Sequence, residues 1–305
     1  MKRHEHRFVA MGGPCRLRLD CTDENLAQQA CNAAETEVRR LESKYSRYLE
    51  NSITSQINRA AGTGTAIAID DETAGLLDYA DTLFRESDGL FDLTSGILRQ
   101  AWDFRSGKIP AAAEIDALLS RIGWDKVERV ANTVALPSPG MEIDFGGCVK
   151  EYASDSAAAV LAKHGIKHAL VDLAGDIAAL NGQFNEPFHE QPWQIGIRHP
   201  REQGHAIAQV SLISGGLATS GDYERCIELD GTRYGHILNP HTGWPSQGLI
   251  GVSLIAEQCL VAGSTATIAM LKPAAEALEW LAALGLPWLA IDAELACHGT
   301  LQHKP

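Results

Sequence analysis

The densest group of residues that could do chemistry lies between positions 217 and 245. It holds His236 and His241 among hydroxyl, amide and carboxylate side chains. The pattern predicts a polar loop followed by a hairpin, with the loop at Thr219–Asp222, strands at Cys226–Leu229 and Arg233–Leu238, and the turn at Asp230-Gly231. Such a hairpin would carry His236 to a polar loop, where the imidazole could transfer protons or could simply bond a neighbouring group.

A second stretch, IDFGGCVK at positions 143–150, combines an acid, two glycines and a lysine. We expect a strand that ends in Asp144, then a Gly-Gly turn, then a helix that continues to His164. Backbone amides at such a junction can bind phosphate oxygens, although many plain turns share the pattern. Lys150 could therefore contact a phosphate or could be a solvated helix residue.

The composition bounds the class of protein. With 305 residues and 45% apolar content, the chain can bury a full core as one large domain or as two closely joined halves. A net charge of −13 argues against a nucleic-acid or anionic-membrane surface. The seven cysteines are scattered without a CxxC pair, which favours reduced thiols and the cytoplasm. No apolar run is long enough for a signal peptide or a membrane span, so we expect neither export nor an anchor.

Periodicity and turn residues predict the remaining elements. Helices are expected at Thr22–Tyr45 with Thr22 as the cap, Ser52–Arg59, Asp70–Ser87, Ala113–Ile122, Val261–Met270 and Pro273–Leu284. Strands are expected within Arg7–Asp20 and at Val127–Val130, Val134–Leu136, His168–Leu173, Trp193–Ile197, Ala206–Leu212, Gly251–Ala256 and Trp288–Ile291, with a polar loop at Ala174–Asp176. Strands joined by turns, with helices gathered elsewhere, predict an α+β fold with largely antiparallel sheets.

The order of these motifs resembles the FAD:protein FMN transferases, also called the ApbE flavin transferases. The matching pieces are Met11-Gly12, Ser46-Arg47-Tyr48, Gly89-Leu90-Phe91-Asp92, Asp144-Phe145-Gly146-Gly147 with Lys150, Gly175-Asp176, Ala218–Glu224, His236–Pro240, Thr242-Gly243 and Ala262–Thr267. The resemblance implies one ApbE-like domain over residues 1–305, or two interleaved subdomains, with an FAD site between two halves. It also implies cleavage of the FAD pyrophosphate and transfer of FMN to a threonine or serine of a partner protein.

The resemblance also implies roles for individual residues. His236 would be the catalytic base. The expected FAD contacts are Met11, Tyr48, Leu90, Phe91, Asp92, Asp144, Lys150, Ser220 and Ile237. Two of these have ordinary structural alternatives, because Asp92 could be a helix cap and Tyr48 could pack in the core.

The metal site implied by the resemblance is incomplete in this chain. The family binds Mg²⁺ through an acid and a threonine four residues apart and through a carbonyl of the Gly-Gly loop. These positions correspond to Gly263, Thr267 and Gly147, so the acid is missing. Further departures are Asn239 in place of aspartate and Glu151 in place of glycine. Asp176 and Asp222 could replace the missing acid only if the fold brings them close to this site.

Two functions follow from this departure. The chain could be a flavin transferase with altered metal dependence, or an FAD-binding protein of the same fold that stores, senses or delivers FAD. Under the second hypothesis, Gly263→Asp should raise transfer strongly. The family's acceptor proteins resemble D-x-x-[ST]-G-A-[ST]. The chain's own Asp92–Leu98 matches the first half of that motif, but Leu98 has no hydroxyl, which excludes self-flavinylation there.

Overall fold

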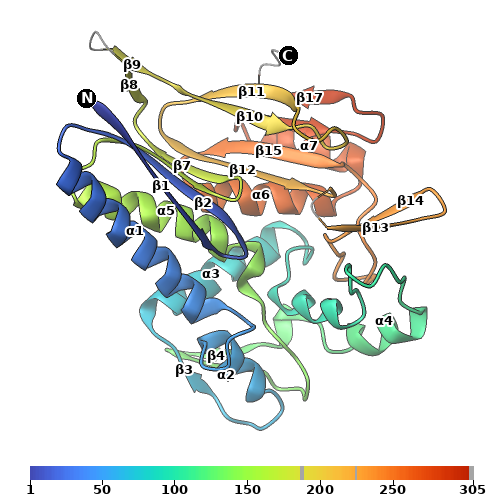
Figure 1. The fold of residues 1–305 in the computed structure, drawn as a ribbon. Helices are drawn as coiled ribbons and strands as arrows, with labels where there is room; N and C mark the ends of the chain where they lie inside the picture. The colour runs from blue at the N-terminus through green and yellow to red at the C-terminus, as the bar shows by residue number, and fades with distance from the viewer. Residues whose placement is uncertain (186–188, 224, 302–305) are drawn as a thin grey trace.

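An eight-stranded antiparallel sheet forms the centre of the molecule (Figure 1). The computed structural model describes residues 1–185, 189–223 and 225–301. In spatial order the strands are β1 (Lys2–Ala10), β2 (Gly13–Cys21), β6 (His168–Leu173), β7 (Asp176–Leu180), β12 (Gly215–Gly221), β15 (Gly251–Ala256), β16 (Trp288–Ile291) and β17 (Cys297–Gly299). Every pair of neighbours is antiparallel. The predicted α+β class with largely antiparallel sheets is confirmed.

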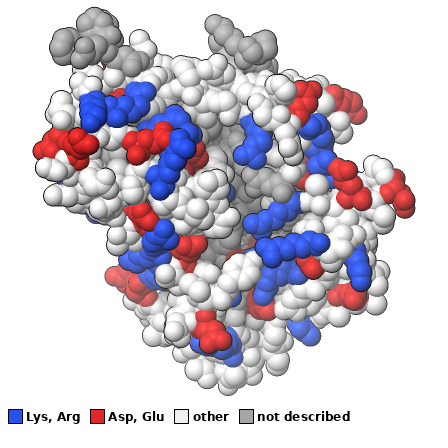
Figure 2. Space-filling model, viewed as in Figure 1, with Lys and Arg blue, Asp and Glu red and all other residues white. Residues whose placement is uncertain are grey.

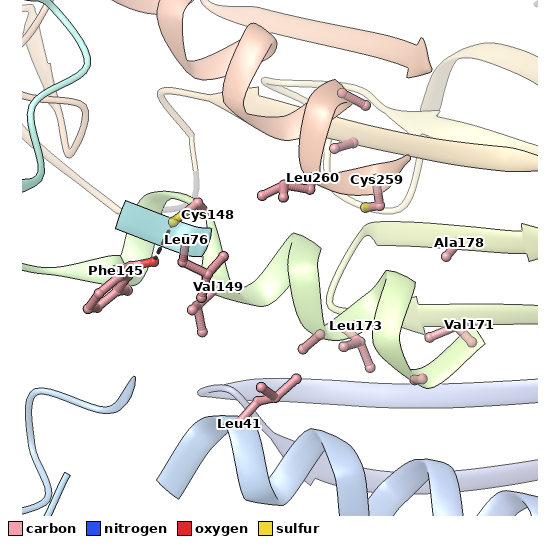
Figure 3. Close-up of a cluster of buried hydrophobic side chains, with 14 of the residues drawn as sticks. Leu41, Leu76, Phe145, Cys148, Val149, Val171, Leu173, Ala178, Cys259 and Leu260 are labelled. Carbon is pink, nitrogen blue, oxygen red and sulfur yellow. Dashed lines mark hydrogen bonds between the residues drawn. The ribbon is translucent and has the colours of Figure 1, made fainter. Parts of the chain in front are cut away.

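Helices cover one face of this sheet and a hairpin covers the other. The helices are α1 (Glu24–Tyr45), α5 (Val149–Lys163), α6 (Cys259–Leu271) and α7 (Ala274–Ala283). The hairpin is β10 (Trp193–Arg198) with β11 (Ala206–Leu212). Successive residues of a strand point to opposite faces, so Leu170 packs with the hairpin while Val171 joins the helical side. Figure 3 shows part of the helical side, including Val149 and Cys259.

A second group of elements lies below the helical layer in Figure 1. It consists of α2 (Ile53–Arg59), α3 (Asp71–Glu86), α4 (Ala112–Leu119), β3 (Ile67–Ala68), β4 (Glu128–Val130) and β5 (Thr133–Ala135), with 3₁₀ helices η1 (Leu93–Gln100), η2 (Trp124–Lys126) and η3 (Phe145–Gly147). Two further hairpins are β8 (Gln183–Asn185) with β9 (His189–Gln191) and β13 (Cys226–Leu229) with β14 (Thr232–Gly235). Tyr79 of α3 joins this group to α6 through a 2.6 Å hydrogen bond between its hydroxyl and Ser264 Oγ.

Helix α6 is buried almost all round, which explains its run of small residues. Its first turn is capped from another helix, because the Asp155 carboxylate of α5 accepts hydrogen bonds from the backbone N–H groups of Cys259 (2.8 Å) and Leu260 (2.9 Å). This cap fixes the start of α6 against α5. Among the helices that the structure describes, none combines the length and the apolar character needed to cross a membrane.

Several local predictions were wrong. Asp23, not Thr22, caps α1, since its side chain accepts from the N–H groups of Asn25 and Leu26. Residues 141–144 form no strand and lead directly into η3. β7 begins at Asp176, inside the predicted loop Ala174–Asp176.

Residues 219–221, predicted as loop, lie in β12 at the centre of the sheet. β12 is paired with β7 and β15, and Thr219 Oγ1 lies 2.7 Å from Ser253 Oγ of β15. Residues 219–221 pair with β15, and this pairing sets their strand conformation although the polar run resembles a loop. The return strand of the hairpin ends at Gly235, so His236 and Ile237 follow it instead of lying within it.

Candidate functional site

The segment that leads into α5 brings together residues from several distant parts of the chain. The Asp144 N–H donates to the Leu93 carbonyl at 2.9 Å, which joins this segment to the one that follows α3. The Asp144 carboxylate accepts from the Gly146 N–H at 3.0 Å and so caps η3. Gly96 leaves room for that carboxylate, since a Cβ there would lie 2.9 Å from Asp144 Oδ2. The Asp144-Phe145-Gly146-Gly147 motif therefore lies next to the segment that follows the Gly89-Leu90-Phe91-Asp92 motif.

Arg47 is the main partner of Asp144 and also of Tyr48. Arg47 forms an ion pair with Asp144, donates to the Tyr48 hydroxyl at 2.8 Å, and lies 4.9 Å from the centre of the Tyr48 ring. Tyr48 itself is 75% exposed, so the alternative that it packs in the core was wrong. Arg47 belongs to the Ser46-Arg47-Tyr48 motif, but the family resemblance assigns it no role. Its contact with the acid Asp144 is visible only in the fold.

Positive charge surrounds the exposed phenol of Tyr48. Burial raises its pKa, but the Arg47 hydrogen bond and the charges of Arg47, Arg225 and Arg99 outweigh that effect and lower it. Figure 2 shows one face of the molecule, on which Lys and Arg side chains gather beside a hollow near its centre. An aromatic ring next to several guanidinium groups suits an anionic ligand that also carries a flat ring system.

Asp92 has the structural role that the sequence left open. It is 8% exposed, and its Oδ1 accepts from the N–H and the hydroxyl of Thr94, each at 2.6 Å. Its Oδ2 accepts from the Trp124 N–H at 3.0 Å. Burial raises the pKa of this carboxyl although these hydrogen bonds act against the change. Asp92 thus caps η1 and ties η2 to it.

Three further residues that were expected to contact FAD are apolar. Phe91 is 5% exposed, and its ring lies against Gly147, where a Cβ would be 3.4 Å from the ring. Leu90 is partly buried. Met11 lies in the turn between β1 and β2 with a φ of 52°, and its N–H donates to Glu42 Oε1 at 2.6 Å.

The first turn of α5 contains a lysine and an acid, and both meet Asp176 of β7. Lys150 Nζ lies 2.9 Å from Asp176 Oδ2, which places the lysine charge on a carboxylate that is 3% exposed. Glu151 is 7% exposed, and burial together with the nearby Asp176 raises its pKa well above the usual range. Lys150 is therefore paired with a buried carboxylate and is not simply a solvated helix residue.

Ser220 and Thr267 form a hydroxyl pair beside this group. Their Oγ atoms lie 3.0 Å apart, which joins the end of β12 to α6. Both residues are partly buried and so remain partly open to solvent. Asp222, considered above as a replacement acid, is instead paired with Arg201 through two hydrogen bonds of 2.8 and 2.9 Å.

His236 follows a close contact between the hairpin and β12. A Cβ on Gly235 would lie 3.1 Å from Asp222 Cβ, just beyond the last residue of β12. The backbone therefore brings His236 to the end of β12 that carries Ser220. Ile237 is partly buried, and its carbonyl accepts from the Ser246 N–H at 2.9 Å. Glu224, the last residue of the neighbouring motif, lies outside the described residues.

The loop after His236 is closed by hydrogen bonds of its own. The Asn239 N–H donates to Trp244 O at 2.8 Å, and Asn239 Oδ1 accepts from the His241 N–H at 2.8 Å. This turn needs only a neutral acceptor, so asparagine can serve at this position without a charge. A cavity of about 370 Å³ has both Asp92 and His241 in its wall. The loop and the segment before η1 therefore face each other.

Within the described ranges, no group of three or more His, Cys, Asp or Glu side chains is placed to hold a metal ion. Any cation site here would have to combine carboxylate with hydroxyl or carbonyl oxygen. Thr267 and Gly147, the residues expected to bind metal, offer a hydroxyl and a carbonyl oxygen but no carboxylate.

Comparison with known proteins identifies the family. The profile of the ApbE family matches residues 11–289. The chain belongs to this family. A Rhodobacter capsulatus FAD:protein FMN transferase is 32% identical over 217 residues, which cover 69% of this chain and 40% of that protein. A Klebsiella pneumoniae FAD:protein FMN transferase is 30% identical over 247 residues, covering 79% of this chain and 73% of that protein.

Solved ApbE structures confirm the fold. The crystal structure of the Thermotoga maritima ApbE protein matches with a TM-score of 0.88 and 29% identity, covering 98% of this chain and 97% of that one. The apo form of the Pseudomonas stutzeri flavinyl transferase ApbE matches with a TM-score of 0.85 and 25% identity, covering 98% and 95%. The resemblance found in the sequence is therefore confirmed over nearly the whole chain.

Proposed function

We propose that this chain is an FAD:protein FMN transferase, which cleaves the FAD pyrophosphate and joins FMN through a phosphoester to a threonine or serine of a partner protein. The observation that carries the proposal is the meeting of separate motifs around the start of α5. Contacts join Leu93 to Asp144, Phe91 to Gly147 and Lys150 to Asp176. Related proteins that bear this activity as their name support it.

The reaction assigns a task to each group. The acceptor hydroxyl oxygen attacks the phosphorus of the FMN half, the bond from that phosphorus to the bridging oxygen breaks, and AMP leaves with this oxygen. The proton of the hydroxyl passes to His236 and then to solvent. Because phosphoryl transfer depends mainly on positioning and charge stabilisation, the remaining site residues serve to hold FAD.

The proposed FAD contacts divide by chemistry. Tyr48 and Phe91 offer rings, Met11, Leu90 and Ile237 offer apolar surface, and Asp144, Ser220 and Lys150 offer polar groups. Asp92 would act through the segment that it caps, since the fold already uses both of its carboxylate oxygens. Mg²⁺ bound near Thr267 and the Gly147 carbonyl would offset the negative charge of the pyrophosphate.

The proposed partner is a flavoprotein with a D-x-x-[ST]-G-A-[ST]-like acceptor sequence. We place the reaction in the cytoplasm, because all seven cysteines are free thiols, as in a reducing compartment. Neither assignment affects the chemistry of the site.

The test is incubation of the purified chain with FAD, Mg²⁺ and an acceptor domain that a related transferase labels. AMP release with flavin-labelled acceptor is the expected result. His236→Asn should slow AMP release about 10²- to 10⁴-fold, as loss of a general base does, while FAD still binds. His164→Asn is the matched control, the same change at an exposed histidine at the end of α5 outside the site, and should leave the rate unchanged. Equal rates for the His236 variant and the wild type would contradict the assigned base.

A second candidate is an FAD-binding protein of the same fold that does not transfer FMN. The glycine at position 263 favours it, since the expected metal-binding acid is absent there. Tight FAD binding without AMP release, with an acceptor that a related transferase does label, would support this candidate over the first.

A further inference from the structure

Glu151 is a buried carboxylate that the fold leaves incompletely satisfied. Its side chain lies at the start of α5 with 7% exposure, and its Oε2 has no hydrogen-bond partner among the described residues. An ionised carboxylate can accept about four hydrogen bonds, and burying one without partners is costly. A group that only stabilised the fold would be expected to have its oxygens occupied.

Gly263 of α6 makes the space that this carboxylate fills. A Cβ at position 263 would lie 2.6 Å from Glu151 Oε1 and 2.9 Å from Glu151 Cδ, closer than real Cβ atoms approach such groups. Any larger residue at 263 therefore conflicts with Glu151 in its present position. Two of the chain's three departures from the family pattern, the glycine at 263 in place of an acid and the acid at 151 in place of a glycine, thus occupy one small volume.

Oxygen ligands lie one helical turn away from this volume. Thr267 follows Gly263 by four residues on α6, so both lie on the same helix face. Its hydroxyl oxygen lies 3.0 Å from that of Ser220, and the residue is partly buried. Gly147 precedes Glu151 by four residues, at the end of η3, the turn that leads into α5.

The charges around Glu151 are unbalanced in a way that suits a cation. Asp176 of β7 is near enough to act on Glu151 through its charge, and Lys150 Nζ lies 2.9 Å from Asp176 Oδ2. Two buried carboxylates thus share one nearby lysine. Carboxylate, hydroxyl and carbonyl oxygens are the ligands that hard divalent cations prefer.

We propose that Glu151 reaches from α5 into the space left by Gly263 and serves as the carboxylate ligand of a divalent-cation site. Thr267 and the Gly147 carbonyl complete its protein ligands. The charge usually supplied from α6 is therefore supplied from the facing helix. The use of this cation in flavin transfer rests on the proposed function, but the binding of the cation does not.

The test is a titration of the purified full chain with Mn²⁺, followed by electron paramagnetic resonance of the free ion, without FAD or acceptor. The wild type is expected to bind one Mn²⁺ that Mg²⁺ displaces. Glu151→Gln keeps the shape of the side chain and should weaken binding about 10- to 100-fold or more, as loss of a ligand-supporting group already does. Glu276→Gln, the same chemical change on α7, is the matched control and should bind as the wild type does.

The double substitution Glu151→Gly with Gly263→Asp moves the acid to the other helix and should restore binding to within about tenfold of wild type. It also keeps the proposal testable if Glu151→Gln does not fold. Absence of Mn²⁺ binding by the wild type, or equal binding by the Glu151→Gln variant, would overturn the proposal.

The same protein variants, incubated with FAD and an acceptor, separate this inference from the proposed function. Mn²⁺ binding that depends on Glu151, without AMP release from FAD, would refute the transferase and leave the cation site standing. AMP release that is undiminished in Glu151→Gln would refute a role of Glu151 in flavin transfer and leave the transferase standing.

Discussion

Two buried carboxylates, Asp92 before η1 and Glu151 in α5, look alike by exposure but differ in what the fold does with them. Asp92 accepts from Thr94 and Trp124, so both of its oxygens are used within the chain. Glu151 keeps Oε2 without such a partner and lies against Gly263 and close to Asp176. Burial alone therefore does not mark a ligand site. An unsatisfied oxygen beside other oxygen ligands is the more informative sign.

The substitution with the largest expected effect on stability is Gly263→Asp alone. It would force a second acid against Glu151, so overpacking and like charge should together lower the free energy of unfolding by about 3 kcal/mol or more. Urea denaturation measures this loss, and Glu151→Gly in the same chain should recover most of it. Additive effects of the two substitutions would break the claim that they share one volume.

This result also changes the test suggested by the sequence. Gly263→Asp was expected to raise transfer if the chain only binds FAD. The structure leaves no room for that side chain while Glu151 is present. A single substitution therefore tests packing, and only the pair tests the metal ligand.

Asp92→Ala should have the next largest effect. It removes the acceptor of two buried N–H groups, which should lower the free energy of unfolding by about 2 kcal/mol. Thermal or urea unfolding measures the loss. Mn²⁺ affinity should stay unchanged in the folded fraction, and a large loss of affinity would erase the distinction between the two carboxylates.

Glu151→Gln should change stability least when no cation is present. A neutral amide of the same shape removes the cost of a buried carboxylate, so the free energy of unfolding should shift by less than about 1 kcal/mol. Wild type and variant can be compared in a chelator and then in Mg²⁺. Stabilisation by Mg²⁺ should appear only in the wild type. A large loss in the chelator would instead indicate a purely structural role.

Many of the strands could be predicted because local sequence patterns determine their bounds. The bounds of β6, β11, β13, β15 and β16 agree with the predicted strands, since each is an apolar run closed by turn residues. β12 was missed: no strand was predicted at Gly215–Gly221, and Thr219 and Ser220 were predicted to lie in a loop. Their strand state depends on pairing with β15, which lies too far along the chain for a local window to contain it.

The candidate site, too, could be predicted only in part. The motif residues could be named from the sequence, and so could the departures at positions 151 and 263. What the sequence lacks is the packing of α5 on α6, which turns two separate departures into one exchange. The same holds for Arg47, whose partner Asp144 lies far along the chain.

The most direct test of this account is a crystal structure of the chain with Mn²⁺, with the ion located by anomalous scattering. We expect one peak at coordination distance, about 2.0–2.6 Å, from a Glu151 carboxylate oxygen and from Thr267 Oγ1. A bound ion away from Glu151, or saturating Mn²⁺ with no peak beside it, would contradict the account.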